Sequence, residues 1–509
     1  MRPGSDRNSP RLRSLRALRP HCYPRPFPLG WFGLVFSKRD ARADHPARAG
    51  SHAVLRFLHV RARSGHRDSW AHSIPDDVGP AFRPDGGPKL VDRLSSAEPK
   101  EWPDIFESSD NKTPARSWRR QQLGAAPLGS LANKANTAEP CFCRLPGDFL
   151  AHNFRRQFDA AAANHSEAAY RQFVHKTMQF LALQLERTFP DTAILPALGN
   201  DDSYCGNYQL QPQGPFLADT LPIFRALVGA LASLGFDRSW MSYGNYSVTV
   251  WGLRMIFPNT VFFSANYHNG CGSAADADPG SATLAWLETE LAAAERAQQR
   301  VWLVYHIPPG VDGFTTLRGG SCPDAIVPMW KQTYAEPFYA LTRRYSDTIV
   351  ASFAGHIHMD DFRLLGGDNG YYGLVLITPA LSPIYGQNPA FRTVTSDAAG
   401  GILDQTTYEL TNLREAADGT PLAWAAEYTF TQAWQLSRID LASLTQLYAM
   451  ITDVPSDRDR WRTFLPVSSL AYWSTNLGEA ARRGALAYRC ADGHVLLPEY
   501  GHCYCSGGG

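Results

Sequence analysis

The strongest constraint on the fold of this chain is the uncharged, mostly apolar run at residues 349–354, which ends in the tetrapeptide Gly355-His356-Ile357-His358. Such a run is typical of a buried strand, and a glycine lets the backbone turn sharply where a strand ends. Two imidazoles two residues apart at that turn can face one shared space, which suits a metal ion. The chain is therefore expected to form a sheet whose strand ends carry metal ligands.

The same order of a hydrophobic stretch followed by a polar side chain recurs upstream, at Asp148, Asn200 and His306. Each residue alone has a simpler explanation, because Asp148 and Asn200 could form turns and His306 could be a buried core histidine. Carboxylate, amide oxygen and imidazole are nevertheless ligands that divalent cations accept. Their repetition at successive strand ends predicts a single metal site.

Helical and strand-like segments alternate along most of the chain, which predicts a layered α/β fold. Helical spacing of apolar residues marks 170–189, 221–234 and 282–299. Strands are expected at 192–198, 246–250, 260–265, 301–304, 371–377 and 407–410. Beyond about residue 416, Trp, Tyr and Leu recur at helical spacing, which predicts a smaller helical domain over 416–509.

Five motifs carry a family resemblance. They are GDFLAH (147–152), GND (199–201), YHIPPG (305–310), FAGHIHMDDF (353–362) and ITPALSPIYGQNPAFR (377–392). Together they resemble the calcineurin-like metallophosphoesterases and, within them, the acid sphingomyelinase-like phosphodiesterases. The resemblance runs from about Gly147 to the C-terminus. It implies a β-sandwich flanked by helices, which we place within a metallophosphoesterase domain at 51–415.

The resemblance also implies an activity, namely hydrolysis of a phosphodiester such as sphingomyelin by a metal-bound hydroxide. Two divalent cations, zinc by analogy with the family, would share the bridging carboxylate of Asp148. Asn200, His306 and His356 would complete one cation site, and His358 would join Asp148 on the other.

A proton donor for the leaving group is expected at His152. The wider superfamily often uses the His of a GNH motif, but Asp201 occupies that place here. By resemblance, His152, four residues after Asp148, faces the substrate and is the predicted catalytic residue. Asp201 would then orient His152 or a metal ligand through a hydrogen bond.

One family motif is missing. Residues 53–59 resemble the first strand of the family's sheet, which an Asp, one further residue and a His should follow, but the chain continues Val60-Arg61-Ala62. We hypothesise that 60–82 and 112–146 are read in a shifted frame or otherwise corrupted, and that 1–50 is a disordered or non-native extension. The second cation would keep two protein ligands instead of four, so weak or absent activity is predicted.

Composition limits the partners and the compartment. A formal net charge of +1 gives no general attraction to nucleic acid, and the lack of an uncharged 18-residue apolar run predicts no transmembrane helix. Nine cysteines favour an oxidising compartment, hence a secreted or periplasmic protein. By resemblance Cys271 pairs with Cys322, while Cys490 could pair with Cys503 or Cys505, and Cys205 has no obvious partner.

Two other functions remain open. One is a different hydrolase of the same fold, acting on nucleotides or phosphomonoesters. The other is a non-catalytic protein that keeps the scaffold and binds a partner. For the main hypothesis the expected partner is a small phosphodiester or a lipid headgroup, with transient membrane contact. The sequence does not assign an oligomeric state.

Overall fold

The computed structural model describes residues 88–107, 142–190, 192–271, 278–319, 321–367, 369–382, 388–412, 422–452 and 479–506. The extension at 1–50, the expected strand at 53–59, the segment 60–82 and residues 112–141 lie outside these ranges. Predictions about those residues therefore stay predictions.

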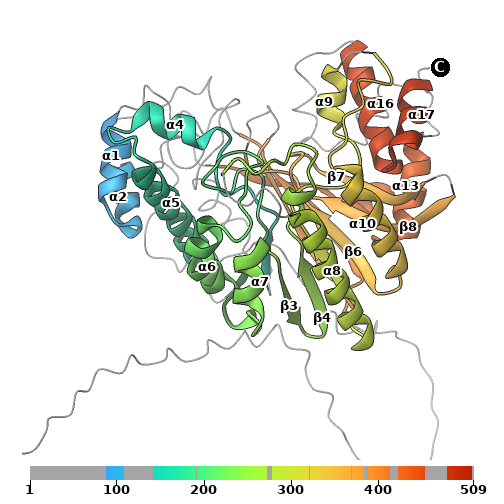
Figure 1. Ribbon diagram of the computed structural model, residues 1–509. Helices are drawn as coiled ribbons and strands as arrows, with labels where there is room; N and C mark the ends of the chain where they lie inside the picture. Colours follow the sequence, from blue (N-terminus) through green and yellow to red (C-terminus); the bar gives the residue numbers. More distant parts are fainter. Residues whose placement is uncertain are drawn as a thin grey trace, which may run out of the picture.

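A six-stranded sheet runs through the molecule in the order β3-β4-β5-β6-β8-β7 (Figure 1). Strands β4, β5, β6 and β8 are parallel to their neighbours in that series, and β3 and β7 close the edges antiparallel. The strands are β3 Tyr246–Val250, β4 Leu253–Phe257, β5 Val301–Val304, β6 Ile349–Ala354, β7 Asp361–Gly367 and β8 Gly370–Ile377. All four residues of β5 are buried, as expected for a central strand of a parallel sheet.

A short parallel pair, β1 Phe142–Leu145 and β2 Ala193–Pro196, packs against this sheet. The ring of Phe142 lies 6.4 Å from that of Trp302 on β5, and the Arg144 guanidinium lies 3.3 Å from the centre of the Phe353 ring on β6. No strand was expected in the segment 112–146, yet its residues 142–145 form β1. The frame-shift hypothesis for the rest of that segment stays a prediction.

A third, antiparallel sheet has the order β11-β10-β9, with β9 Ala390–Ser396, β10 Ile402–Leu410 and β11 Trp424–Thr429. The indole N–H of Trp302 donates to the carbonyl oxygen of Gly400 at 2.8 Å, which joins the β9–β10 turn to the six-stranded sheet. The ring of Trp424 lies 5.3 Å from that of Phe391 on β9. The expectation that residues beyond 416 are helical is therefore wrong at 424–429.

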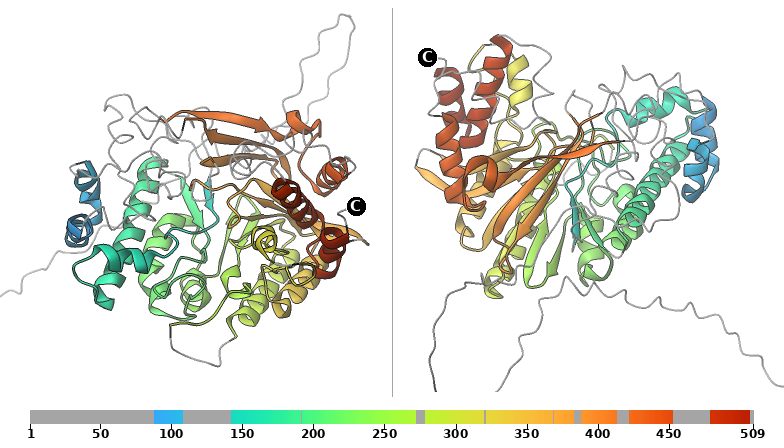
Figure 2. Two further views of the ribbon diagram at one scale, coloured as in Figure 1. Left: turned by 90° about the horizontal axis from the view of Figure 1, so that it is seen from above. Right: turned by 180° about the vertical axis from the view of Figure 1, so that it is seen from behind.

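Helices cover both sides of the sheets (Figures 1 and 2). On one side, helix α6 contacts strand β2, and α5 packs on α6. On the other side, α8 contacts β4, α10 contacts β8 and α16 contacts β7. The helices are α1 Pro88–Ser96, η4 Pro99–Glu101, α2 Trp102–Glu107, α4 Phe154–Ala161, α5 Glu167–Thr188, α6 Pro215–Val228, η6 Gly229–Leu231, α7 Phe236–Tyr243, η7 Thr260–Phe263, α8 Pro279–Arg296, α9 Gly313–Arg318, α10 Gln332–Arg344, α12 Phe430–Trp434, α13 Leu441–Thr452, α16 Glu479–Gly493 and α17 Leu497–Ser506. The layered α/β class is thus confirmed, while the division into domains stays a prediction.

The expected helices at 170–189 and 282–299 are confirmed as α5 and α8. The helix expected at 221–234 begins earlier, at Pro215, and ends before Gly229, whose φ of 61° breaks it. The strand expected at 260–265 is wrong, because Thr260–Phe263 forms the 3-10 helix η7. The Asn259 side chain accepts a hydrogen bond from the Val261 amide at 3.2 Å and caps that helix.

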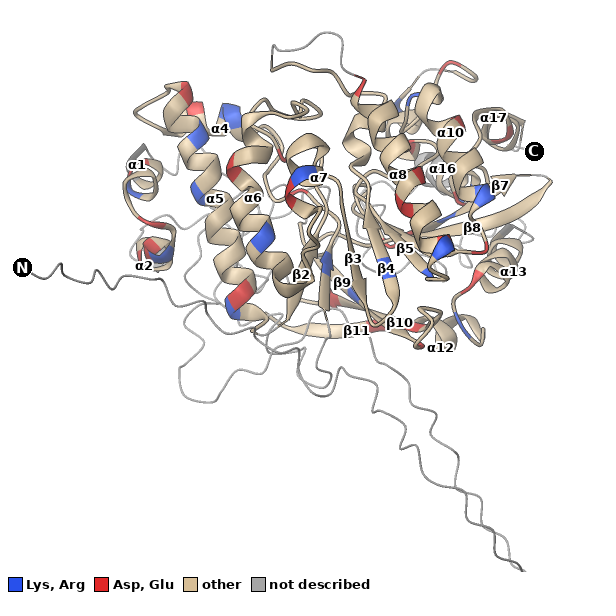
Figure 3. Cartoon of the chain, turned by 60° about the horizontal axis from the view of Figure 1, so that its bottom comes forward, with Lys and Arg blue, Asp and Glu red and all other residues tan. Residues whose placement is uncertain are grey.

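Charges of both signs are interspersed on helices α4 to α8 (Figure 3).

Among the residues that the structure describes, no helix is long and apolar enough to cross a membrane.

Candidate metal centre

The carboxyl ends of two neighbouring parallel strands bring two imidazoles together. Val304 at the end of β5 pairs with Phe353 on β6, so His306 and His356 leave the same edge of the sheet, each two residues beyond its strand. The amide of Gly355 donates to the carbonyl oxygen of His306 at 2.9 Å and holds the two loops together. Ligands are commonly bound at this edge of a parallel sheet.

The second parallel pair delivers the oxygen ligands. Leu145 at the end of β1 pairs with Pro196 at the end of β2, and Asp148 and Asn200 follow in the next loops. Gly199 allows their close approach, because a Cβ at that position would overlap the Asp148 side chain. Gly147 is equally tight, since a Cβ there would lie 2.8 Å from His306 Nδ1.

Three side-chain atoms converge on His306 Nε2. It lies 3.1 Å from Asp148 Oδ2, 2.9 Å from Asn200 Oδ1 and 3.2 Å from His356 Nδ1. One ligand atom each from Asp148, His306 and His356 lie within 4.8 Å of one another. Four ligands bound tetrahedrally at about 2.0–2.2 Å would be about 3.3–3.6 Å apart, so a slight expansion of this cluster accommodates a cation.

The hydrogen bonds around the cluster show which atoms carry protons. His306 Nδ1 lies 2.7 Å from the carbonyl oxygen of Pro146 and must donate to it, because a carbonyl only accepts. The Asn200 amide nitrogen donates to Asp201 Oδ2 at 3.1 Å and to Asn207 Oδ1 at 2.8 Å, which turns Oδ1 toward His306. When the His306 imidazole is neutral, Nε2 carries no proton, so its lone pair faces the lone pairs of Asp148 Oδ2 and Asn200 Oδ1. A bound cation would accept the lone pairs of these three atoms.

The pKa values of the cluster fit metal ligands. Burial raises the pKa of Asp148. The charge and hydrogen bond of His306, with the charges of His152 and His356, together outweigh burial and lower this pKa, so the carboxylate is ionised. Burial lowers the pKa of His306, but the charge and hydrogen bond of Asp148, the Pro146 carbonyl and the Asp202 charge together outweigh burial and raise it, so a proton and a cation compete for Nε2. Burial and the nearby His306 lower the pKa of His356, which is therefore neutral, the form that binds metals.

The backbone is strained at these positions. Asp148, His356 and His358 have φ angles of 58°, 73° and 61°, a left-handed conformation that is unfavourable for residues other than glycine. Such strain is concentrated where a site requires particular side-chain directions.

His358 lies beside the cluster, next to His152. Their rings are stacked, with centroids 6.1 Å apart and planes 17° apart. Burial, followed by the charge of His152, lowers the pKa of His358 to about 3, so it is a neutral imidazole. The structure therefore gathers four of the five predicted ligands around one point and places the fifth against the predicted acid.

His152 forms a close ion pair with Asp201, with Nδ1 2.5 Å from Oδ2. Burial lowers the pKa of His152, but the hydrogen bond and charge of Asp201 and the charge of Asp148 outweigh it, so the net pKa lies above its usual value of 6.5. The two carboxylates therefore favour the protonated form of His152.

Sequence reasoning missed three residues of this region. Asp202 is fully buried and accepts hydrogen bonds from four backbone amides, those of Asp148, Phe149, Leu150 and Gly199, at 2.8–3.0 Å. Asn207 orients the Asn200 amide, and the Tyr208 hydroxyl lies 3.3 Å from His356 Nε2. In the sequence, Asp202 could have been found from its position next to the GND motif. Asn207 and Tyr208 have no such signal, because their contacts with Asn200 and His356 depend on the folded loop.

Within the described ranges the structure has three disulfides. The expected pair of Cys271 with Cys322 is wrong. Cys271 is bonded to Cys205, because the loops that carry them lie together, with the His268 amide donating to the Tyr208 carbonyl oxygen at 3.2 Å. The other bonds are Cys322–Cys505 and Cys490–Cys503, the second of which was one of two expected alternatives. Among the described cysteines, Cys143 is outside a disulfide.

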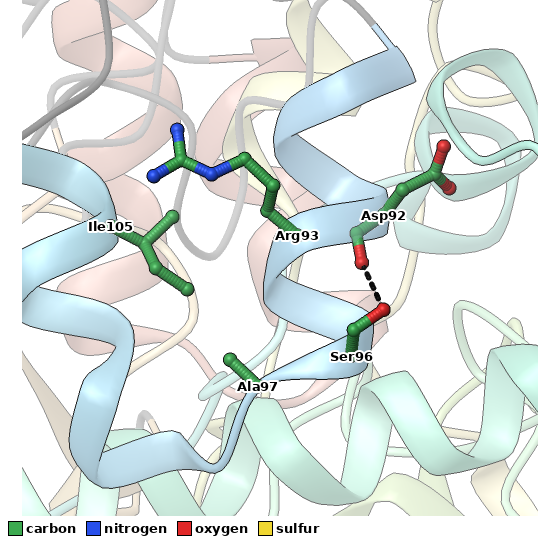
Figure 4. A pocket seen from close by; sticks show the side chains of 5 residues that line it. All are labelled: Asp92, Arg93, Ser96, Ala97 and Ile105. Carbon is green, nitrogen blue, oxygen red and sulfur yellow. Dashed lines mark hydrogen bonds between the residues drawn. The ribbon is translucent and has the colours of Figure 1, made fainter.

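An open pocket of about 500 Å³ lies between α1 and α2 (Figure 4). It is lined by Asp92, Arg93, Ser96, Ala97 and Ile105. The Ser96 hydroxyl donates to the Asp92 carbonyl oxygen at 2.8 Å. None of the metal-centre residues lines this pocket.

No family model matches the chain. A sphingomyelinase phosphodiesterase D from Dictyostelium discoideum is 30% identical over 273 residues, 50% of this chain and 56% of that protein. The human acid sphingomyelinase-like phosphodiesterase 3b is 26% identical over 401 residues, 74% of this chain and 78% of that protein. The chain is a distant homologue of the acid sphingomyelinase-like phosphodiesterases.

A cyclic GMP-AMP phosphodiesterase from Rattus norvegicus belongs to the same set of relatives, with 28% identity over 291 residues, 54% of this chain and 60% of that protein. The chain thus spans little more than half the length of the Dictyostelium and rat relatives. A solved dimetal phosphatase from Danio rerio aligns with a TM-score of 0.33 and 12% identity over 70% of this chain and 96% of its own, which is too low to support a fold assignment. The predicted relationship to acid sphingomyelinase-like phosphodiesterases is confirmed by the sequence comparisons.

Proposed function

We propose that this chain is a metal-dependent hydrolase of phosphodiesters with a metallophosphoesterase-type fold. The observation that carries the proposal is the convergence of Asp148 Oδ2, Asn200 Oδ1 and His356 Nδ1 on His306 Nε2, within 3.2 Å. A carboxylate oxygen, an amide oxygen and two imidazole nitrogens held this close in a largely buried position form a ligand set that divalent cations accept. The homologues' activity on phosphodiesters supplies the reaction class.

The residues fit one divalent cation fully and a second in part. Asp148, Asn200, His306 and His356 would hold the first, and His358 with Asp148 would contribute to the second. When bound, the cations supply Lewis acidity that activates water and stabilises charge on the phosphoryl oxygens. Zinc suits the set of imidazole, carboxylate and amide ligands, although manganese or iron would accept it too.

His152 is the proposed proton donor to the leaving oxygen. Its Nδ1 is engaged by Asp201 at 2.5 Å, which assigns proton transfer to Nε2. Its raised pKa favours the protonated ring that a proton donor requires.

The activity of this chain is proposed to be weak. Only His358 and the shared Asp148 serve the second cation among the described residues, because the Asp-x-His motif that the family resemblance implies is absent after His59. Losing direct ligands should reduce metal affinity by more than the tenfold to hundredfold typical of indirect partners.

The proposed substrate is sphingomyelin or another phosphodiester with a comparable headgroup. The rat relative, a cyclic GMP-AMP phosphodiesterase, favours nucleotide phosphodiesters as the second candidate. The three disulfides support the proposal of an extracytoplasmic location.

The test combines metal analysis with a substrate panel. Purified protein reconstituted with Zn²⁺ or Mn²⁺ is assayed with bis-p-nitrophenyl phosphate, sphingomyelin, cyclic GMP-AMP and a phosphomonoester. We expect slow, chelator-sensitive hydrolysis of diesters that His306→Ala abolishes and His165→Ala, a change at an exposed histidine on the α4–α5 loop, leaves unchanged. Metal binding without hydrolysis of any ester would favour the non-catalytic alternative.

A further inference from the structure

Residue 201 contacts three of the site residues at once. Its backbone N–H donates to Asp148 Oδ1 at 3.1 Å. A single carboxylate oxygen, Oδ2, lies 3.1 Å from the Asn200 amide nitrogen and 2.5 Å from His152 Nδ1. Asp201 is 4% exposed, so solvent does not compete for these contacts. We infer that Asp201 is a positioning residue that holds the metal-ligating amide of Asn200 and the proton-donating imidazole of His152 in one fixed arrangement.

The contact with Asn200 determines which end of that amide faces the cation. An Asn side chain has two N–H donors and one oxygen. Its two donors go to Asp201 Oδ2 and Asn207 Oδ1, so its oxygen points at His306 Nε2, 2.9 Å away. Without Asp201 one of the two restraints is lost, and the amide can rotate its N–H₂ group toward the cation site.

The contact with His152 determines where that ring carries its proton. A carboxylate only accepts hydrogen bonds, so at 2.5 Å Nδ1 must be the donor. Nδ1–H is thereby fixed, and Nε2 is the nitrogen that exchanges a proton with a substrate. The same oxygen therefore sets both the orientation of a metal ligand and the tautomer of the acid.

The neighbouring Asp202 provides a contrast. Its carboxylate bonds only to backbone amides in the described contacts, from Asp148, Phe149, Leu150 and Gly199, and so maintains the loops. Asp201 instead bonds to side chains that take part in the proposed chemistry. The inference rests on the proposed function for the roles of Asn200 and His152, but the contacts themselves do not depend on it.

The test measures Zn²⁺ affinity and the His152 ring nitrogens, not turnover. Zn²⁺ dissociation constants are obtained by chelator competition. The tautomer of His152 is read from its ¹⁵N side-chain shifts in the metal-free protein, assigned by loss of the signals in His152→Gln. The variants are Asp201→Ala and the near-isosteric Asp201→Leu, which both lack an acceptor, Asp201→Asn, which keeps one, and Asn207→Ala, which removes the other restraint on Asn200.

We expect Asp201→Ala and Asp201→Leu to weaken Zn²⁺ binding about tenfold to a hundredfold and to mix the His152 tautomers. Asp201→Asn should keep near wild-type affinity and the Nδ1–H tautomer. Asn207→Ala should weaken Zn²⁺ binding while leaving the His152 shifts unchanged. A folded Asp201→Ala or Asp201→Leu protein with wild-type values for both quantities would overturn the inference.

The wild-type protein provides a check that requires no variant to fold. His152 should carry its proton on Nδ1, and a neutral ring protonated only on Nε2 would refute the inference. If no ester is hydrolysed although Zn²⁺ affinity and tautomer respond as expected, the proposed function fails and the role of Asp201 stands.

Discussion

His306 Nδ1 donates a hydrogen bond of 2.7 Å to the carbonyl oxygen of Pro146, and this bond fixes Nε2 as the atom that faces the ligand cluster. Pro146 lies directly before the Gly147-Asp148 turn. The bond therefore links the end of β1 to the loop after β5, so that the segment delivering the carboxylate also orients the imidazole. Such outer hydrogen bonds fix the tautomer of a metal-binding histidine.

Gly199→Ala should destroy the metal centre. A Cβ at position 199 would overlap the Asp148 side chain, and the nearby Asp148 backbone cannot move aside without breaking the loop. We expect at least a hundredfold loss of Zn²⁺ affinity, measured by chelator competition. Gly235→Ala is the matched control, because the nearest atom to its new Cβ is 4.0 Å away. Equal Zn²⁺ affinity in the two variants would contradict the described geometry.

Asp202→Ala should destabilise the protein by about 3 kcal/mol or more, because four buried amides lose their acceptor and each unsatisfied group costs about 1–3 kcal/mol before water or relaxation compensates. Urea unfolding followed by fluorescence measures the difference. Asp324→Asn, at an exposed position, is the control and should change stability by less than about 0.5 kcal/mol. A change below about 1 kcal/mol for Asp202→Ala would show that its four bonds do not hold the loops.

The pH profile of turnover should reflect His152. Since its folded pKa is raised above 6.5, the protonated form needed by an acid persists below that raised value and is lost as pH rises through it. The rate should then fall about tenfold per pH unit on the alkaline side. Asp201→Asn removes the charge that raises the pKa, so the fall should begin at lower pH. A profile that is identical in the two proteins would exclude His152 as the acid.

The long-range disulfide should stabilise the fold more than the local one. Cys322 and Cys505 are 183 residues apart, whereas Cys490 and Cys503 are 13 apart. Loop-closure entropy predicts losses of about 5 and about 3 kcal/mol when each pair is replaced by serine. Urea unfolding of the two double variants compares them. A larger loss for the Cys490/Cys503 variant would show that packing around α16 and α17, and not chain entropy, dominates.

The convergence of His306 and His356 was predictable because each follows a hydrophobic stretch that forms a strand. His306 and His356 stand two residues beyond strands β5 and β6, and the parallel register makes such positions neighbours. Asp148 and Asn200 follow the second parallel pair in the same way. The order of residue types along the chain therefore predicts which side chains lie together, because neighbouring parallel strands end at the same edge of a sheet.

Other features depend on contacts that no local pattern contains. The bulky, β-branched composition of Thr260–Phe263 favours a strand, but the Asn259 cap and burial of the aromatic rings select a 3-10 helix. Cysteine spacing leaves disulfide connectivity open, so the bond of Cys205 to Cys271 could only come from the packing of two loops. The orientation of Asn200 by Asn207 is likewise set by loop conformation.

The most direct test of the central claim is anomalous diffraction at the zinc edge from crystals of the Zn²⁺-loaded protein. An anomalous peak bound by Asp148, Asn200, His306 and His356, at about 2.0–2.2 Å from their ligand atoms, is the predicted result. A Zn²⁺-loaded crystal with these four side chains still bonded to one another and no peak between them would contradict it.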